Sequence, residues 1–203
     1  MMEEFPNVYF QALSDGTGFI AIDKVINEIK ELNLIKQNPR FISVKPDGCA
    51  PMAHAWEKAV KNNFPEGWTT DYPIYENPQT IVPTLATGNQ GNYRIISELT
   101  RKTDGDILIA KESKLVDIAR LIAYETTVRV GPASALTIGG FFKALKKGLL
   151  HNGDNIMINI GEGVRRAPDF MEDMIYTTEI VKSIDECKRV NRADLKDMLW
   201  SKI

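Results

Sequence analysis

A strand–helix unit that occurs twice in succession near the start of the chain limits the possible folds more than any other feature. Mostly apolar runs at Val8–Leu13 and Arg40–Val44 have the length and composition of buried strands. Each is followed by a segment with apolar residues at helical spacing, Phe19–Leu34 and Ala50–Asn62. Strands that alternate with helices are typical of a parallel sheet covered by helices. We therefore expect an α/β fold with three layers, in which a mostly parallel sheet carries helices on both faces.

The same alternation continues, less regularly, to about residue 170. Further helices are predicted at Asn92–Arg101, Lys114–Glu125 and Pro132–Leu149, and further strands at Asp106–Ala110, Thr127–Val130 and Asn155–Ile160. Ser113 precedes the second of these helices and is a favourable N-cap residue. Residues 63–88 are rich in Pro, Gly, Thr and aromatic residues and lack periodicity. They predict a long surface excursion that serves as a lid or an oligomer contact.

The chain is predicted to consist of one domain and an appendage. Residues 1–170 form the α/β domain in this division. Residues 171–203 form the appendage, with an edge strand at Tyr176–Ser183 and a terminal helix at Ala193–Trp200.

Composition excludes several classes of function. The 203 residues carry a formal net charge of -2 without a basic stripe, so nucleic acid is a poor candidate partner. We found no 18-residue apolar run and no secretory leader, which predicts a cytoplasmic protein without a membrane partner. The two cysteines, Cys49 and Cys187, are far apart and exclude a disulfide framework. With His54 and His151 as the only histidines, no Cys/His metal site is expected.

The turn that follows the first predicted strand is the first candidate site. Its sequence is Ser14-Asp15-Gly16-Thr17-Gly18. The two glycines allow close backbone approach, the hydroxyls can donate hydrogen bonds, and the following helix N-terminus attracts anions. The turn therefore suits a phosphate group, whereas the alternative is a tight strand–helix turn with a capping residue. Asp15 favours the alternative, because a carboxylate repels a dianion unless it points away or is neutralised.

The turn that follows the last strong strand is the second candidate site. The sequence Ile158–Pro168 contains a Gly-Glu-Gly turn and two arginines. Open α/β sheets bind ligands at the carboxyl ends of their strands. Asn159 or Glu162 could bond a ring nitrogen, and Arg165 or Arg166 could pair with a carboxylate or phosphate. The alternative is a surface turn with solvated arginines.

Two other segments have a simpler structural interpretation. Cys49 lies at a strand–helix junction, where a helix dipole would lower the pKa of a thiol, but a small buried cysteine is the favoured interpretation. His54 is expected to pack or to cap a helix. The sequence GNQGN at Gly88–Asn92 could form an anion-binding nest, and we favour a plain helix start.

Four motifs in this order resemble those of the threonine synthase family of fold-type II pyridoxal-phosphate enzymes. They are YFQALSDGTGFIAIDK at the phosphate turn, CAPMAHAW in the next helix, VGPASALTIGGFFKAL in the penultimate core helix and INIGEGVRRAP at the cofactor-ring turn. The resemblance covers most of residues 8–170 and is greatest to the cysteate synthases. It implies the C-terminal half of a larger enzyme that carries out β-replacement or elimination on a phosphorylated amino acid.

The resemblance also implies roles for individual residues. The cofactor, pyridoxal 5'-phosphate, would be held at its phosphate by Ser14, Gly16, Thr17 and Gly18. Its ring would face Asn159, Gly161 and Glu162, and the substrate would meet Arg165 and Arg166. For a cysteate synthase the reaction is O-phosphoserine plus sulfite to cysteate plus phosphate. For a threonine synthase it is O-phosphohomoserine to threonine.

Departures from the family pattern keep other functions open. The family's Schiff-base lysine lies upstream of the phosphate turn, so we expect no catalytic residue in this chain, and Lys24 points away from the strand ends. An N-terminal half or a second copy of the chain is the expected partner. A second hypothesis is a non-catalytic, diverged homologue, which Asp15 and the missing lysine favour. A third is an unrelated nucleotide-binding domain.

Overall fold

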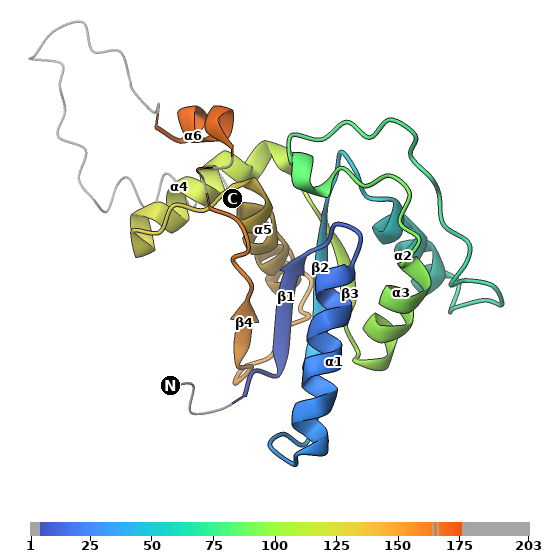
Figure 1. Ribbon diagram of the computed structural model, residues 1–203. Coiled ribbons are helices and arrows are strands. Elements are labelled where there is room, and N and C mark those ends of the chain that lie inside the picture. Colours follow the sequence, from blue (N-terminus) through green and yellow to red (C-terminus); the bar gives the residue numbers. More distant parts are fainter. Residues whose placement is uncertain (1–4, 164, 166, 176–203) are drawn as a thin grey trace, which may run out of the picture.

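The computed structural model describes residues 5–163, 165 and 167–175, and its centre is a parallel sheet of four strands (Figure 1). The strands lie in the order β3-β2-β1-β4. Their bounds are Val8–Ala12 for β1, Arg40–Pro46 for β2, Asp106–Ala110 for β3 and Ile156–Ile158 for β4. In the parallel register, Val8 lies opposite both Arg40 and Ile156. The predicted α/β fold with a parallel sheet is confirmed.

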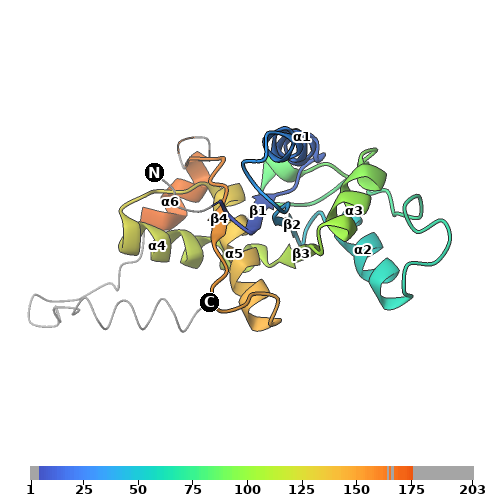
Figure 2. The same cartoon turned by 90° about the horizontal axis from the view of Figure 1, so that it is seen from below.

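Helices cover both faces of this sheet and give the expected three layers (Figure 2). One face packs against α1 (Thr17–Glu31), α2 (Pro51–Lys61) and α3 (Tyr93–Lys102). The other face packs against α5 (Pro132–Lys146), which contacts α4 (Leu115–Thr126), and α4 in turn contacts α6 (Pro168–Ile175). The described residues also form two short 3-10 turns, η1 (Pro83–Leu85) and η2 (Glu112–Lys114).

The alternation of side chains along β2 separates two hydrophobic cores. Phe41 faces α1 and packs edge-on against Phe19, with their ring centroids 4.8 Å apart. Val44 faces α5, where Gly140 allows the helix to approach closely. A Cβ atom on that glycine would lie 2.2 Å from a methyl carbon of Val44, so the contact requires glycine.

Two predicted local structures are wrong. The segment Thr127–Val130 is not a strand: Val130 makes one isolated antiparallel bridge with Gly163, and Thr127 ends α4 with a left-handed backbone (φ 63°). Ser113 is not an N-cap, because it lies inside η2 and α4 begins only at Leu115. The serine cap signal instead marks a tighter turn that precedes the helix.

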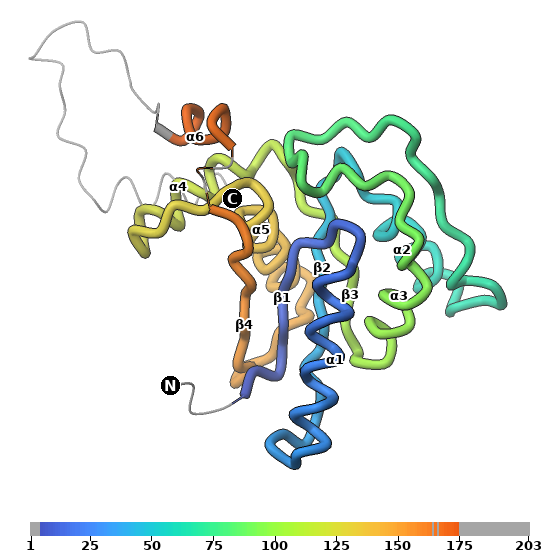
Figure 3. Tube along the Cα trace, viewed as in Figure 1, coloured from blue at the N-terminus to red at the C-terminus, as the bar shows by residue number. Residues whose placement is uncertain are grey.

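Residues 63–88 form the predicted excursion, with η1 as their one regular element (Figure 3). The segment runs past α2 and α3 and then crosses to the carboxyl ends of the strands. Near α2, Trp68 packs on Trp56, and the excursion ends in buried contacts at Val82 and Leu85. The excursion therefore reaches the edge of the sheet at which ligands bind in α/β folds.

Helix α6 runs across the boundary between residues 170 and 171, at which we placed the end of the domain and the start of the appendage. Its Phe170 is buried in the core on the α5 side of the sheet. The predicted strand Tyr176–Ser183 and helix Ala193–Trp200 lie outside the described residues. Among the described helices, none has both the length and the apolar character needed to span a bilayer.

Candidate functional site

The glycine turn after β1 already contains an anion, the side chain of Asp15. One carboxylate oxygen accepts a hydrogen bond from the backbone N–H of Thr17 at 3.0 Å, and the other accepts one from the Thr17 hydroxyl at 2.6 Å. These hydrogen bonds lower the pKa of Asp15, the hydroxyl contributing most. Gly16 has a left-handed backbone (φ 92°), which lets the chain enter α1 at this point. Both donors of Thr17 that were expected to hold a phosphate are therefore engaged by the chain's own carboxylate.

The excursion and the start of α3 hold this turn from outside. The Ser14 hydroxyl donates to the carbonyl of Thr84 at 2.9 Å. The Gln90 side chain donates to the carbonyl of Ser14 at 2.6 Å, and the Asn92 side chain donates to the carbonyl of Asp15 at 3.1 Å. The segment Gly88–Asn92 thus leads into the helix α3, with Asn92 as its N-cap residue, as favoured, and the side chains of Gln90 and Asn92 fix the turn.

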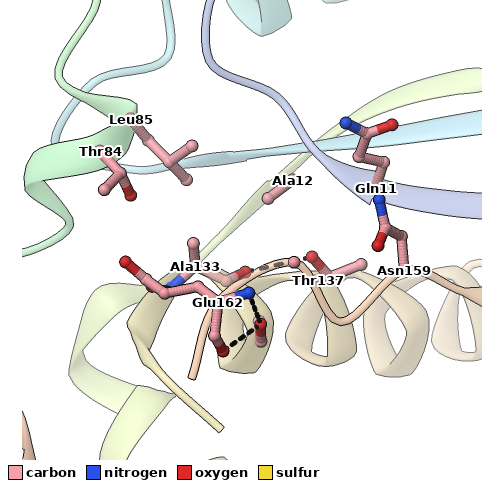
Figure 4. Close-up of a pocket in the computed structure, with 10 residues that line it drawn as sticks. Gln11, Ala12, Thr84, Leu85, Ala133, Thr137, Asn159 and Glu162 are labelled. Atoms are coloured by element: carbon pink, nitrogen blue, oxygen red, sulfur yellow. Dashed lines mark hydrogen bonds between the residues drawn. The ribbon is translucent and has the colours of Figure 1, made fainter. Parts of the chain in front are cut away.

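A cavity of about 260 Å³ lies between the ends of β1 and β4 and the first turn of α5 (Figure 4). The three predicted ring-side residues, Asn159, Gly161 and Glu162, line it. The remaining lining residues come from β1, η1 and α5; they are Gln11, Ala12, Thr84, Leu85, Ala133, Ser134 and Thr137. The two candidate turns are thus placed at the same end of the sheet, but only the second turn lines the cavity.

Glu162 fixes the ring-side turn to the N-terminus of α5. Its carboxylate accepts a hydrogen bond from the backbone N–H of Ala133 at 2.8 Å. Its carbonyl accepts from the N–H of Gly131 at 3.0 Å and from the hydroxyl of Ser134 at 2.8 Å. A carboxylate at a helix N-terminus satisfies a free N–H group and interacts favourably with the helix dipole. Glu162 therefore acts on α5, while part of its surface borders the cavity (Figure 4).

Asn159 belongs to a chain of hydrogen bonds that starts in the sheet. Its side-chain amide donates to the hydroxyl of Tyr9 at 3.1 Å, and that hydroxyl donates to Gln11 at 3.0 Å. Burial raises the pKa of Tyr9, and the hydrogen bond from Asn159 offsets part of the rise. The tyrosine is therefore neutral near pH 7 and orients both amides at the rim of the cavity.

The remaining predicted residues lie elsewhere. Ser14, Gly16, Thr17 and Gly18 are beside the cavity but do not line it. Arg165 is exposed, and Arg166 lies outside the described residues. As they stand, the described residues suit an aromatic ring in the cavity but do not suit a phosphate dianion at the turn, because the Asp15 carboxylate is negatively charged and engages both donors of Thr17. We derive no catalytic step from them.

Sequence reasoning missed Lys45, which follows the predicted end of its strand by one residue. The side chain is fully buried beneath η1, and its ammonium donates to the carbonyl of Leu85 at 3.2 Å. Burial lowers its pKa to about 8, although the nearby Cys49 opposes the shift. Cys49 is itself buried, as favoured, and burial raises the pKa of its thiol.

His54 neither packs in the core nor caps a helix with its side chain; it is exposed, and its Nδ1 lies 3.7 Å from Glu57. Among the described residues, no three His, Cys, Asp or Glu side chains cluster as metal ligands would. The other missed residues, Ser134 and Thr137, are three apart at the start of α5. Their spacing on one helix face, directly after Gly131-Pro132, was the available signal.

Comparison with known proteins places these features in a family. A threonine synthase of Methanocaldococcus jannaschii is 27% identical over 163 residues, which are 80% of this chain and 38% of that protein. A cysteate synthase of Methanothrix thermoacetophila is 28% identical over 172 residues, 79% of this chain and 39% of that protein. The chain thus spans about two fifths of the length of these curated relatives.

Solved structures support the same fold. A T.th. threonine deaminase superposes with a TM-score of 0.54 at 19% identity, over 81% of this chain and 52% of that chain. Maize serine racemase superposes with a TM-score of 0.56 at 17% identity, over 78% of this chain and 43% of that chain. The profile of the family described as "Pyridoxal-phosphate dependent enzyme" matches residues 1–161. The chain therefore belongs to the family of pyridoxal-phosphate-dependent enzymes.

Proposed function

We propose that the chain supplies the cofactor-ring part of an enzyme that replaces or eliminates the phosphate of a phosphorylated amino acid. The preferred reaction is that of a cysteate synthase, in which O-phosphoserine and sulfite give cysteate and phosphate. The alternative is that of a threonine synthase, from O-phosphohomoserine. The observation that carries the proposal is the cavity at the strand ends, which Asn159, Gly161 and Glu162 line within a family that uses this cofactor.

The chain's own residues would bind and orient the cofactor. Pyridoxal phosphate supplies the electron sink in enzymes of this family, and the protein orients it. In the proposal the Asn159 amide and the Ser134 and Thr137 hydroxyls border the ring. Ser14, Gly16, Thr17 and Gly18 hold the phosphate after Asp15 has moved away, and the exposed Arg165, together with Arg166, meets the substrate.

A lysine for the Schiff base has to come from another segment, because none of the residues that line the cavity is a lysine. An N-terminal half or a second copy of the chain is the proposed source. Incubation of the purified chain with pyridoxal phosphate and then borohydride should therefore leave no lysine stoichiometrically modified. A stable adduct at one lysine, found by peptide mass spectrometry, would contradict this part of the proposal.

The second candidate function is that of a non-catalytic, diverged homologue. The hydrogen bonds between Asp15 and Thr17 favour it, because they occupy both donors of Thr17 and place a negative charge at the turn. In this case the residues around the cavity have only a structural role, in which Glu162 holds the turn after β4 to the N-terminus of α5.

A titration of the isotope-labelled chain with pyridoxal phosphate, followed by amide NMR, separates the two candidates. The enzyme proposal expects saturable shifts at Ser134, Thr137 and Gly161, with weaker but similar shifts from pyridoxal. The homologue without cofactor expects none of these shifts. Replacing Thr137 with Val, which keeps the shape and removes the hydroxyl, should weaken binding, whereas Thr70→Val in the excursion is the matched control.

Catalysis is tested by adding the segment of the Methanocaldococcus jannaschii threonine synthase that precedes its matched region. Phosphate release from O-phosphoserine in the presence of sulfite should require both polypeptides. Release from O-phosphohomoserine instead would favour the alternative reaction. Cofactor-dependent shifts in the cavity without any phosphate release from either substrate would refute the proposed reactions.

A further inference from the structure

Gln11 connects the cavity at the ends of β1 and β4 with the glycine turn. It lies one residue before the end of β1, and its side chain lines the cavity. Its amide nitrogen, Nε2, reaches the first turn of α1, because a Cβ atom built on Gly18 would lie 2.7 Å from it. Ser14, Gly16, Thr17 and Gly18 do not line the cavity. Gln11 therefore extends from the cavity to the turn that is proposed to hold the phosphate.

The orientation of this amide is fixed by a chain of hydrogen bonds. The Tyr9 hydroxyl donates to Oε1 of Gln11 at 3.0 Å and accepts from the Asn159 amide at 3.1 Å. Tyr9 and Gln11 are two residues apart on β1, so their side chains project from the same face of the sheet. Burial raises the pKa of Tyr9, and its hydroxyl therefore keeps its proton near pH 7. The amide oxygen of Gln11 is thus engaged by Tyr9, which leaves Nε2 directed at the glycine turn.

Nε2 of Gln11 is a hydrogen-bond donor that is available to a ligand. A glutamine amide nitrogen carries two N–H groups. Among the described residues, none accepts a hydrogen bond from Nε2 of Gln11. The side chain is half-buried and borders the cavity, so a ligand there can reach it. By contrast, both donors of Thr17 are engaged by Asp15. Gln11 therefore supplies a donor at the turn that the chain's own carboxylate does not occupy.

The cavity has room for an aromatic ring beside this donor. Its volume is about 260 Å³, and Gln11 and Asn159 lie on one side of it, with Thr84 and Leu85 across from them (Figure 4). An amide N–H bonds more strongly to an anionic oxygen than to a neutral one. Because Nε2 faces the glycine turn, the oxygen that it meets belongs to the end of the ligand nearest that turn. In the proposed function this end is the phosphate.

We propose that Gln11 determines the specificity of this site by donating a hydrogen bond from Nε2 to the phosphate of a ligand whose aromatic ring lies in the cavity. Tyr9 is the positioning residue that holds the amide in this orientation. An amide held in this way offers the ligand an N–H group and not an oxygen, so it selects the phosphate ester over the corresponding alcohol. The inference rests on the proposed function, from which it takes pyridoxal phosphate as the ligand.

The first test replaces the donor with an anionic oxygen and keeps the shape of the side chain. Gln11→Glu retains an oxygen for the Tyr9 hydroxyl but loses the N–H groups. In calorimetric titrations it should weaken binding of pyridoxal phosphate about tenfold or more, and binding of pyridoxal less than about threefold. Gln37→Glu adds the same charge at an exposed position just before β2, at the opposite end of the sheet. This control should leave both affinities within about twofold.

The second test follows the amide itself by NMR of the isotope-labelled chain. The side-chain N–H signals of Gln11, assigned through its backbone, should shift with pyridoxal phosphate and by far less with pyridoxal. This measurement uses the parent chain, so it does not depend on how any variant folds. Tyr9→Phe removes the bond that orients the amide and should lower the preference for pyridoxal phosphate over pyridoxal about threefold or more. Tyr75→Phe, in the excursion, is the matched control and should leave the preference unchanged.

The results distinguish this inference from the proposed function. If Gln11→Glu weakens both compounds equally or neither of them, or if the Gln11 signals respond equally to both, the role of Gln11 is overturned and the proposed function stands. If the parent chain does not bind pyridoxal phosphate, both are overturned. If the preference for the phosphate depends on Gln11 but the combined polypeptides release no phosphate from either substrate, only the proposed reactions are overturned.

Discussion

Replacing Asp15 with Asn should convert the glycine turn into a better site for phosphate. The substitution removes the negative charge but keeps a side-chain oxygen that can accept the hydrogen bond from the Thr17 N–H, now 3.0 Å from the carboxylate. The entry into α1 at Gly16 should therefore persist. We expect the free energy of unfolding to change by less than about 1 kcal/mol, since the capping interaction is retained in part.

The size of the gain follows from the position of the carboxylate. Asp15 is exposed, so the dielectric constant of water applies, and two unit charges about 4 Å apart interact by about 1 kcal/mol. A phosphate of nearly two charges at that distance gains about 2 kcal/mol when the carboxylate is neutralised. The dissociation constant of pyridoxal phosphate should therefore fall about 30-fold.

Calorimetric titration with pyridoxal phosphate and with pyridoxal separates the phosphate from the ring. Only the phosphate ester should bind more tightly to Asp15→Asn. Glu28→Gln, an exposed substitution farther along α1, is the control for the loss of one negative charge and should leave both affinities unchanged. An equal gain for pyridoxal, or no gain for either compound, would refute the assignment of this turn to the phosphate.

Three further predictions concern stability, measured by urea unfolding with tryptophan fluorescence. Gly140→Ala should lower the free energy of unfolding by about 1–3 kcal/mol, because its Cβ would collide with Val44, whereas Gly91→Ala has open space and should change it by less than about 0.5 kcal/mol. Burial opposes ionisation of Asp154, but the hydrogen bonds that its carboxylate accepts outweigh burial and lower its pKa. Asp154→Asn should therefore lower the free energy of unfolding by about 2 kcal/mol at pH 7. The difference between the variant and the parent chain should shrink as the pH falls through that lowered pKa. Lys45→Met should stabilise the chain by about 1–2 kcal/mol at pH 7, because the parent chain buries a charged lysine there and burial lowers its pKa to about 8. The gain should fade as pH rises from 8 to 10.5, because in this range the folded parent chain loses the proton and no longer buries a charge. Destabilisation at pH 7 would contradict this.

The strands and helices that could be predicted from sequence are those whose periodicity agrees with their tertiary surroundings. The apolar run at β1 and the helical spacing in α1 predicted elements within a few residues of those in the structure. The prediction of a strand at Thr127–Val130 was wrong because its β-branched residues favour strands, whereas within the described part of the chain the segment makes only the isolated bridge from Val130 to Gly163. Local propensity cannot supply a hydrogen-bonding partner.

The candidate site was predictable only in part for a related reason. The negative charge of Asp15 was enough to indicate that the glycine turn is poorly suited to a phosphate. The position of the ring-side turn could be predicted because it follows a strand and ligands bind at strand ends. Three contacts depend on η1, which is about 70 residues from the glycine turn: the bond from Ser14 to Thr84, the cover over Lys45 and one wall of the cavity. No pattern in the irregular excursion indicates where it will return to the sheet.

The strand order has a consequence for the time at which the sheet is completed. The central strand β1 pairs with β4, and Val8 lies opposite Ile156 at the far end of the described sequence. At typical rates of synthesis, roughly 10–30 s separate the two segments as they leave the ribosome. Until then one edge of β1 has no partner within the chain, and an unpaired strand edge is a template for misassembly. Contacts between such distant residues also form slowly. Closure of the sheet by β4, and with it the ring-side cavity, is therefore expected to be a late step of folding.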